Sequence, residues 1–153
     1  MLKEGAKAPD FSLSNDEGKT FSLKDFKGKK IVLYFYPRDN TPGCTTEACG
    51  FRDVYDEILA KGAVVIGVSA DSETSHQKFK KKFDLPFYLL SDPDKTCIKA
   101  YNAWGEKSMY GKMLMGILRS TFVIDEKGMV IKVFPKVSPK EHAKEVLEVL
   151  DGK

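Results

Sequence analysis

Residues 31–44 read IVLYFYPRDNTPGC, and this stretch decides the fold. Its first six residues form a continuous β-branched and aromatic run, which is typical of a buried central strand. A proline then ends the strand, and a Pro-Gly pair leads into Cys44, at or near the first turn of a helix predicted from about Thr45 to Lys61. Reactive groups in open α/β sheets gather at the carboxyl ends of strands. This loop is therefore where we expect the chemistry.

Strands and helices alternate on either side of this stretch. We expect a hairpin of Phe11–Leu13 and Thr20–Leu23, a buried strand Ala63–Ser69, a helix from about Ser72 to Phe83, a strand Phe87–Leu90, a helix from Asp92 to Ala100, a hairpin of Ser120–Asp125 and Met129–Phe134, and a closing helix Pro139–Leu150. This order predicts an α/β fold: a central mixed sheet flanked by helices, with an N-terminal β-hairpin. One domain is expected over residues 1–153.

Composition excludes several classes of function. A chain of 153 residues, 42% hydrophobic and 31% charged, has enough apolar material for a core and too much for a disordered chain. A net charge of +3 does not indicate a nucleic-acid or anionic-membrane partner. The apolar runs are far shorter than the ~20 residues that span a bilayer, and the first residues lack the apolar segment of a secretory signal. We therefore expect a cytoplasmic protein with neither of these partners.

Position alone leaves two interpretations of Cys44. A helix N-terminus carries roughly +0.5 charge and free N–H groups, both of which favour a thiolate over a thiol. Thr41, three residues earlier, offers a hydroxyl that can donate to a sulfur or to a bound oxygen. These features indicate a nucleophile. The alternative is that Cys44 is a small buried apolar residue.

The spacing of Cys44 and Cys49 restricts what the pair can do. It is neither a C-x-x-C dithiol nor ordinary zinc spacing. On one intact helix, residues five apart have Cα atoms ~8–9 Å apart, whereas a disulfide needs ~4.4–6.8 Å. The pair can therefore bridge only if the first turns of the helix unwind, which suits a catalytic disulfide better than a structural one. The alternative is two unrelated helix cysteines.

The sequence offers few partners for Cys44. Both histidines, His76 and His142, are expected to be exposed on helices, so neither a Cys–His site nor a metal site is indicated, and no cofactor is expected. Thiolate stabilisation is then left to the helix start and an arginine. Arg119 directly precedes the strand at 120–124. If that strand neighbours the first central strand, Arg119 lies beside Cys44.

An apolar stretch precedes Arg119. It consists of Met109, Met113, Met115, Ile117 and Leu118. We interpret it as core or pocket lining, with a partner or dimer surface as the alternative.

Taken together, these motifs resemble a known family. The pattern Pro37-x-x-x-Thr41-x-x-Cys44, with Cys49 and the later run Arg119-Ser120-Thr121-Phe122, resembles a peroxiredoxin. The C-x-x-x-x-C spacing is similar to that of the Q-type, or bacterioferritin-comigratory, subgroup. The resemblance extends from Gly5 to the final helix. It implies a thioredoxin-like fold and thiol-dependent reduction of hydrogen peroxide and organic hydroperoxides, with a role in antioxidant defence and redox homeostasis.

The resemblance also implies roles for the residues around the reactive sulfur. Cys44 is the peroxidatic thiolate, which attacks the peroxide O–O bond and becomes a sulfenic acid. Thr41 and Arg119 hydrogen-bond the thiolate and the peroxide oxygens, and Pro37 packs over the pocket and limits water. Glu47, one turn after Cys44, is expected to orient Arg119.

The same resemblance implies how the sulfenic acid is resolved. Cys49 forms an intrachain disulfide with Cys44, and a thioredoxin-like protein reduces it. Some Q-type members place this second cysteine on a later helix, so Cys97 is a rival to Cys49. Relatives of this type are often monomers, and we expect a monomer here, with a dimer as the alternative.

Two other functions use the same residues. A non-enzymatic redox sensor or chaperone-like module would use the disulfide as a switch, and it would not consume many equivalents of peroxide per chain. A thiol–disulfide oxidoreductase is disfavoured because the C-x-x-C motif is absent.

Overall fold

The computed structural model describes residues 1–152, apart from the side chain of Met109, which lies outside the description. Strands β1–β9 span Leu13–Asn15, Thr20–Phe21, Lys30–Phe35, Ala63–Ser69, Tyr88–Ser91, Trp104–Met109, Lys112–Ile117, Ser120–Ile124 and Val130–Phe134. Helices α1–α5 span Pro42–Asp53, Tyr55–Ala60, Glu73–Phe83, Thr96–Ala100 and His142–Leu150, and a 3-10 turn η1 spans Leu23–Phe26. The expected order of elements is confirmed, with three differences: the pair β6–β7 and the turn η1 are additions, and the predicted helix from Thr45 to Lys61 is divided into α1 and α2.

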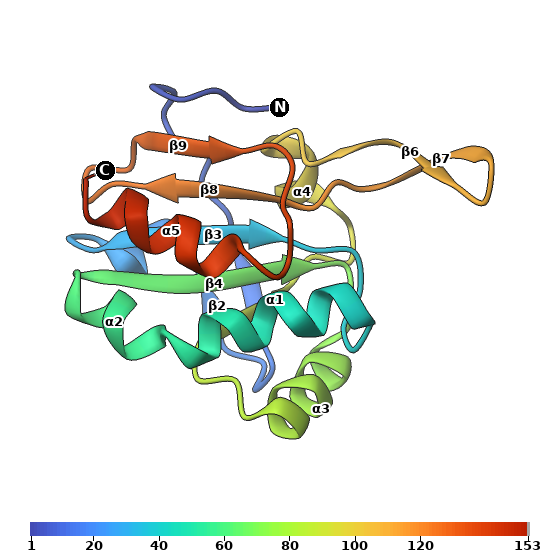
Figure 1. Cartoon of the computed structure of the whole chain (residues 1–153), viewed down its shortest axis with the longest axis horizontal. Coiled ribbons are helices and arrows are strands. Elements are labelled where there is room, and N and C mark those ends of the chain that lie inside the picture. The colour runs from blue at the N-terminus through green and yellow to red at the C-terminus, as the bar shows by residue number, and fades with distance from the viewer. Residues whose placement is uncertain (153) are drawn as a thin grey trace.

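The centre of the molecule is a seven-stranded mixed sheet in the order β2-β1-β5-β4-β3-β8-β9 (Figure 1). Strand β3 lies between β4, which is parallel to it, and β8, which is antiparallel. Every residue of β4 and β8 is buried, as is all of β3 except Lys30. The continuous apolar runs therefore form the middle of the sheet, as the sequence predicts. The N-terminal hairpin, β1 with β2, is also confirmed.

Successive residues of β3 point to opposite faces of the sheet and so enter two separate cores. Leu33 and Phe35 pack on the face that carries α4 and η1. Val32 and Tyr34 pack on the other face, against residues of α1, α2, α3 and α5. Figure 1 shows α1, α2 and α5 in front of the sheet. Helices thus cover both faces, and α1 follows the end of β3 on the second face.

The helix predicted from Thr45 to Lys61 is two helices, α1 and α2. Val54 separates them with φ −118° and ψ 12°, outside the helical region. A β-branched residue is a weak helix former, but it is not a breaker such as proline. The sequence therefore carried no clear sign of this interruption. The break limits α1 to 12 residues.

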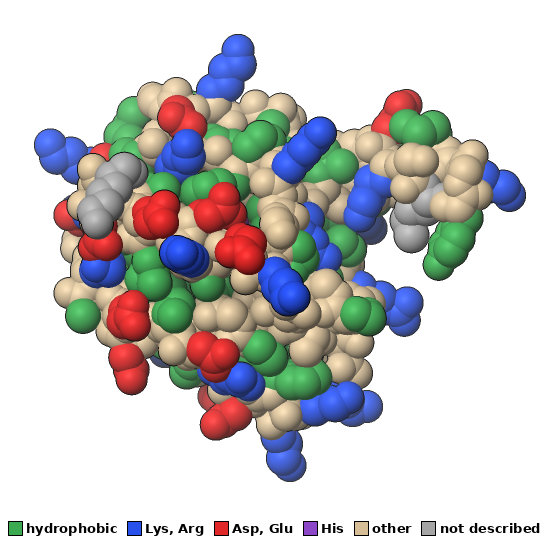
Figure 2. All heavy atoms as spheres, in the orientation of Figure 1, with side chains coloured by type: hydrophobic (Ala, Val, Ile, Leu, Met, Phe, Trp, Pro, Cys, Tyr) green, Lys and Arg blue, Asp and Glu red, His purple; other side chains and the backbone are tan. Residues whose placement is uncertain are grey.

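Met113 and Met115 of the apolar stretch before Arg119 do not line the core, whereas Ile117 is buried and Leu118 half-buried; the side chain of Met109 lies outside the description. The stretch lies mainly in β6–β7, a hairpin that projects from the body of the molecule (Figures 1 and 2). Met113 and Met115 are 62% and 56% exposed, whereas Ile117, at the base of β7, is buried. Tyr110 and Gly111 form the turn, both with positive φ. Tyrosine is unusual at such a position, which is why turn chemistry did not reveal the hairpin.

No helix within residues 1–152 combines the length and the apolar character needed to cross a bilayer.

Candidate active site

Cys44 lies at the start of α1, next to the carboxyl end of β3. Thr41 is the N-cap residue, and its carbonyl accepts the first helical hydrogen bond, from Thr45 N at 2.8 Å. Cys44 is therefore the third helical residue, within the turn that carries unpaired N–H groups. Its side chain is buried in the core cluster between α1 and the sheet.

The sheet brings Arg119 to the same place. Strand β8 runs antiparallel to β3 with Ser120 opposite Phe35, so the residue just before β8 lies level with the end of β3. The Nη2 atom of Arg119 donates to Cys44 Sγ at 3.2 Å, and Nη1 donates to Glu47 Oε1 at 2.7 Å. The planar guanidinium thus joins the sulfur and the carboxylate. The expected positions of Arg119 beside Cys44 and of Glu47 beside Arg119 are both present.

Burial and the neighbouring charges shift the pKa values of Glu47 and Arg119. Glu47 is 1% exposed, and burial raises the pKa of its carboxyl group to about 7, although the charge and hydrogen bond of Arg119 oppose the rise. Its Oε2 atom has no hydrogen-bond partner in the described chain. Burial alone would lower the pKa of Arg119, but Cys44 and Glu47 raise it above its ordinary value. Arg119 therefore stays charged, while Glu47 titrates near neutral pH.

Gly43 leaves room for the Arg119 guanidinium, a role that the sequence analysis did not identify. A Cβ atom on Gly43 would lie 3.2 Å from Arg119 Nη2 and 3.7 Å from Pro139 Cγ. The guanidinium passes directly over this backbone because no side chain is there.

Thr41 and Pro37 lie in the loop between β3 and α1, and both are half-buried. The Thr41 hydroxyl donates to the carbonyl of Arg38 at 3.0 Å. Because a hydroxyl has one proton, it is directed at the loop and not at Cys44, while its oxygen can still accept a hydrogen bond. Arg119 is thus in direct contact with Cys44 and with Glu47, and Thr41 and Pro37 lie in the loop just before Cys44.

The three cysteines are free thiols in different surroundings. Cys49 is half-buried and lies on α1 with Cys44, with no break between them. Cys97 is buried on α4, in the core on the opposite face of the sheet from Cys44. Burial, followed by the charge of Asp92, raises the pKa of the Cys97 thiol far above its ordinary range. The sheet therefore separates Cys97 from Cys44.

Both histidines are fully buried, so the expectation that they lie exposed on helices is wrong. The Nε2 atom of His142 lies 2.7 Å from Thr121 Oγ1 on β8, and burial together with the charge of Arg119 lowers its pKa to about 4. His142 is therefore neutral at pH 7. His76 lies 2.7 Å from Asp39, in the loop that leads to Cys44. These partners are far away in the sequence, and local patterns do not reveal them.

Lys107 shows that the projecting hairpin is close to the site. It lies half-buried on β6. Burial and the charge of Arg119 lower the pKa of its ammonium group, and Cys44 opposes this effect. Local sequence patterns did not reveal this proximity, because it depends on the path of strands β6 and β7, which were not predicted.

The chain matches a known protein family and is similar to named relatives along most of its length. Residues 5–133 match the AhpC/TSA family. The chain is 52% identical over 146 residues to a putative peroxiredoxin bcp of Coxiella burnetii, covering 95% of this chain and 97% of that one. It is 53% identical over 149 residues to peroxiredoxin Bcp of Bacillus subtilis, covering 97% and 95%.

Solved structures agree with these matches. A bacterioferritin comigratory protein of Xanthomonas campestris, studied for alkyl peroxide reduction, superposes with a TM-score of 0.90 at 39% identity, covering 99% of this chain and 97% of that one. A peroxiredoxin Q mutant of Xylella fastidiosa gives a TM-score of 0.93 at 35% identity, covering 99% and 97%.

The raised pKa of Glu47 predicts how stability depends on pH. The folded state holds the Glu47 proton more tightly than the unfolded chain, in which the ordinary value is 4.5. Relative to Glu47→Gln, the wild type should therefore lose about 3 kcal/mol of unfolding free energy as the pH rises from about 4.5 to 8. Urea unfolding at a series of pH values measures this difference.

Glu57→Gln is the matched control, because Glu57 is exposed on α2 and close to none of these groups. The difference between wild type and this control variant should stay constant with pH. A constant difference for Glu47→Gln as well would contradict the burial argument.

Proposed function

The chain belongs to the AhpC/TSA family and is a peroxiredoxin, and we propose that Cys44 is the sulfur that reduces its hydroperoxide substrate. One observation carries this assignment: the Arg119 guanidinium joins Cys44 Sγ to the buried carboxylate of Glu47. A guanidinium held in place beside the sulfur offers a charged hydrogen-bond donor where peroxide must bind, and the thiolate is the reactive form of a cysteine.

In the first step the Cys44 thiolate attacks one oxygen of the hydroperoxide. The O–O bond breaks, Cys44 becomes a sulfenic acid, and the other oxygen leaves as water or an alcohol after taking up a proton. The sulfur loses two electrons and the peroxide gains them. Arg119 stabilises the negative charge that moves from sulfur to the leaving oxygen. Thr41 offers a hydroxyl oxygen to the peroxide proton, and Pro37 restricts water at the loop.

Glu47 acts through Arg119 in this proposal. By accepting from Nη1 it leaves Nη2 directed at the sulfur. Glu47 is thus a positioning residue, and it does not touch the peroxide.

In the second step Cys49 attacks the sulfenic sulfur, an S–S bond forms and water leaves. Cys49 is favoured over Cys97 because it lies on the same helix and is partly accessible, whereas Cys97 is buried across the sheet. Within α1, residues 42–50 include two glycines and two threonines, which are weak helix formers. The unwinding that this step needs is therefore concentrated where the helix is weakest.

The cycle ends when the dithiol of a thioredoxin-like protein reduces the Cys44–Cys49 disulfide by exchange. We place this reaction in the cytoplasm, where such a donor is kept reduced. The proposed cycle needs the residues of one chain only, and we propose a monomer as the working unit.

The assignment of the cysteines predicts distinct products after one equivalent of hydrogen peroxide. The wild type and Cys97→Ser should both lose two hydrogens, with Cys44 joined to Cys49. Cys49→Ser should instead gain one oxygen on Cys44, and its turnover with thioredoxin should fall by about two orders of magnitude. Intact mass and thiol mapping after rapid quenching distinguish these products. A Cys44–Cys97 bond in the wild type would transfer the second role to Cys97, and an unmodified Cys44 would exclude it as the peroxide-reducing sulfur.

The need for unwinding predicts the effect of stiffening α1. Gly50 has room for a methyl group, because its nearest neighbour would be Ala143 Cβ at 3.5 Å, an ordinary contact. Alanine in a helix interior is favoured over glycine by about 0.5–1 kcal/mol. In Gly50→Ala, disulfide formation should therefore slow by about two- to fivefold, while oxidation of Cys44 by peroxide keeps its rate. Quenched-flow thiol mapping gives both rates, and an unchanged rate of disulfide formation would show that α1 need not open.

A further inference from the structure

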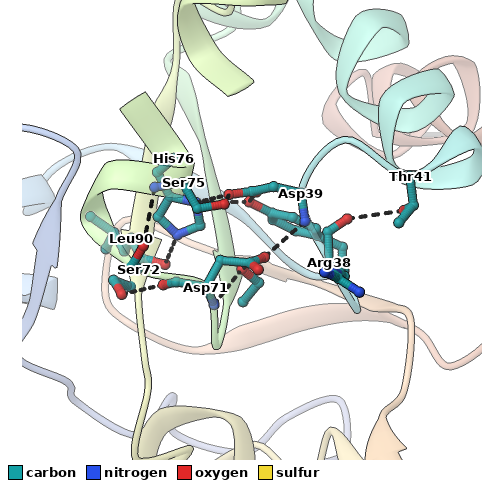
Figure 3. Close-up of polar contacts among 11 residues, drawn as sticks. Arg38, Asp39, Thr41, Asp71, Ser72, Ser75, His76 and Leu90 are labelled. Atoms are coloured by element: carbon teal, nitrogen blue, oxygen red, sulfur yellow. Dashed lines mark hydrogen bonds and ion pairs between the residues drawn. The ribbon is translucent and has the colours of Figure 1, made fainter. Parts of the chain in front are cut away.

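A buried hydrogen-bond network holds the loop just before Cys44 (Figure 3). Its centre is Asp39, whose side chain is 3% exposed. One carboxylate oxygen, Oδ2, lies 2.7 Å from His76 Nδ1 and accepts from Ser75 Oγ at 2.8 Å. The other, Oδ1, accepts from the Tyr36 hydroxyl at 2.5 Å. The backbone N–H of Asp39 donates to Asp71 Oδ2 at 2.8 Å.

His76 joins Asp39 to the backbone of strand β5. Its Nε2 atom lies 3.0 Å from the carbonyl oxygen of Leu90 on β5, and its Nδ1 atom faces the Asp39 carboxylate. The imidazole is therefore held on both sides of its ring, by a residue of the loop and by the backbone of β5. Removing Asp39 would leave His76 Nδ1 with only the Tyr36 hydroxyl, 3.4 Å away, and removing His76 would take one of three side-chain hydrogen bonds from the buried Asp39 carboxylate. Both losses are unfavourable.

The network ties the end of β3 to elements other than α1. Ser75 and His76 come from α3, and Leu90 comes from β5. Asp71 follows β4 and also accepts from Ser69 Oγ at 2.7 Å. The chain is thus fixed at Asp39, two residues before the N-cap of α1.

The backbone conformation and the contacts of the chain change directly after Asp39. Asn40 has φ +60°, a turn conformation, and α1 then begins at Pro42. The side-chain contacts of Thr41 and Thr46 are local, to the carbonyls of Arg38 and Pro42. Thr41 is therefore held by a local contact, whereas Cys44 and Glu47 beyond it are buried and are held from outside α1, by Arg119.

We infer that the His76–Asp39 pair is a positioning device with two effects on the reaction. It keeps the loop in the geometry that Cys44 needs to meet peroxide, and it confines the opening of the chain to residues from Thr41 onward. Neither side chain touches the sulfur, so both act through the backbone of the loop. The second effect rests on the Cys44–Cys49 disulfide of the proposed function, and the first does not.

Binding of a metal ion is the alternative role for the side chains of Asp39, Asp71 and His76. Within the described residues, ligand atoms of Asp39, Asp71 and His76 lie within 4.8 Å of one another. The network already provides hydrogen bonds for these three side chains. A metal would have to replace those bonds. The rate of Cys44 oxidation after treatment with EDTA therefore distinguishes metal binding from the hydrogen-bond network.

The test compares two rates in Asp39→Asn and His76→Gln. Quenched-flow thiol mapping gives the rate of Cys44 oxidation by hydrogen peroxide and the rate of subsequent disulfide formation. We expect the first to fall by about tenfold or more, because a displaced loop misplaces the reacting groups. The second should stay the same or rise, because the loop opens more easily. Opposite responses of two steps are not what a general loss of stability produces.

Asp92→Asn is the matched control. Asp92 is also a buried aspartate, 2% exposed, and it accepts from the backbone N–H of Ile98 at 2.8 Å in α4. Its loss should lower the free energy of unfolding without changing either rate. The proposal is overturned if Asp39→Asn changes neither rate, if both rates fall by the same factor, or if EDTA reproduces the effect in the wild type.

Two further outcomes remain decisive. If the wild type forms no Cys44–Cys49 disulfide, the proposed second step fails, but slower oxidation of Cys44 in Asp39→Asn still supports positioning of the loop. If the two main variants do not fold, Ser75→Ala removes one hydrogen bond to Asp39 and leaves the pair intact. It should slow Cys44 oxidation by a few-fold, and a wild-type rate would then overturn the proposal.

Discussion

The contact of Arg119 with both Cys44 and Glu47 is the interaction on which the site depends. Cys44 and Glu47 belong to α1, and Arg119 is the residue before β8. The contact therefore exists only because β8 pairs with β3 in the observed register. A slip of one residue would move Arg119 by about 3.4 Å and turn it to the other face of the sheet. The buried central strands, which exclude such a slip, are therefore a requirement of the proposed chemistry as well as of stability.

That contact places polar groups in a core that is otherwise apolar. Glu47 Oε2, the Tyr34 hydroxyl and His142 Nδ1 are buried without a hydrogen-bond partner among the described residues. All three lie on elements that pack into the core on the α1 face. Buried polar groups without partners are unfavourable, so the packing of α1 contributes less stability than its apolar contacts suggest. The opposite face of the sheet has no buried side-chain atom of this kind in the described chain.

The predictable part of the molecule is the part determined by local pattern. The apolar runs identified β3 and β4, and the Pro-Gly-Cys sequence identified the start of α1. The position of Arg119 followed from one assumption, that its strand neighbours β3. Burial of His76 and His142 was not predictable, because their partners Asp39 and Thr121 lie 37 and 21 residues away. Hairpin β6–β7 was missed because Tyr110 occupies a turn position that usually favours glycine or asparagine.

The two sides of Cys44 are held by different kinds of interaction, and the proposed cycle needs this difference. Upstream, the His76–Asp39 pair, whose side chains are 0% and 3% exposed, anchors the loop to α3 and β5, and Asp71, just after β4, accepts from the Asp39 backbone N–H. Downstream, α1 begins with weak helix formers over a partly polar core. A loop held equally firmly on both sides would react with peroxide but could not bring Cys44 to Cys49, because local opening has a free-energy cost set by the contacts it breaks. A loop held weakly on both sides would open readily but would lose the geometry around Arg119. Firm anchoring before Thr41 and weak helix after it allow one sulfur to meet both requirements in turn.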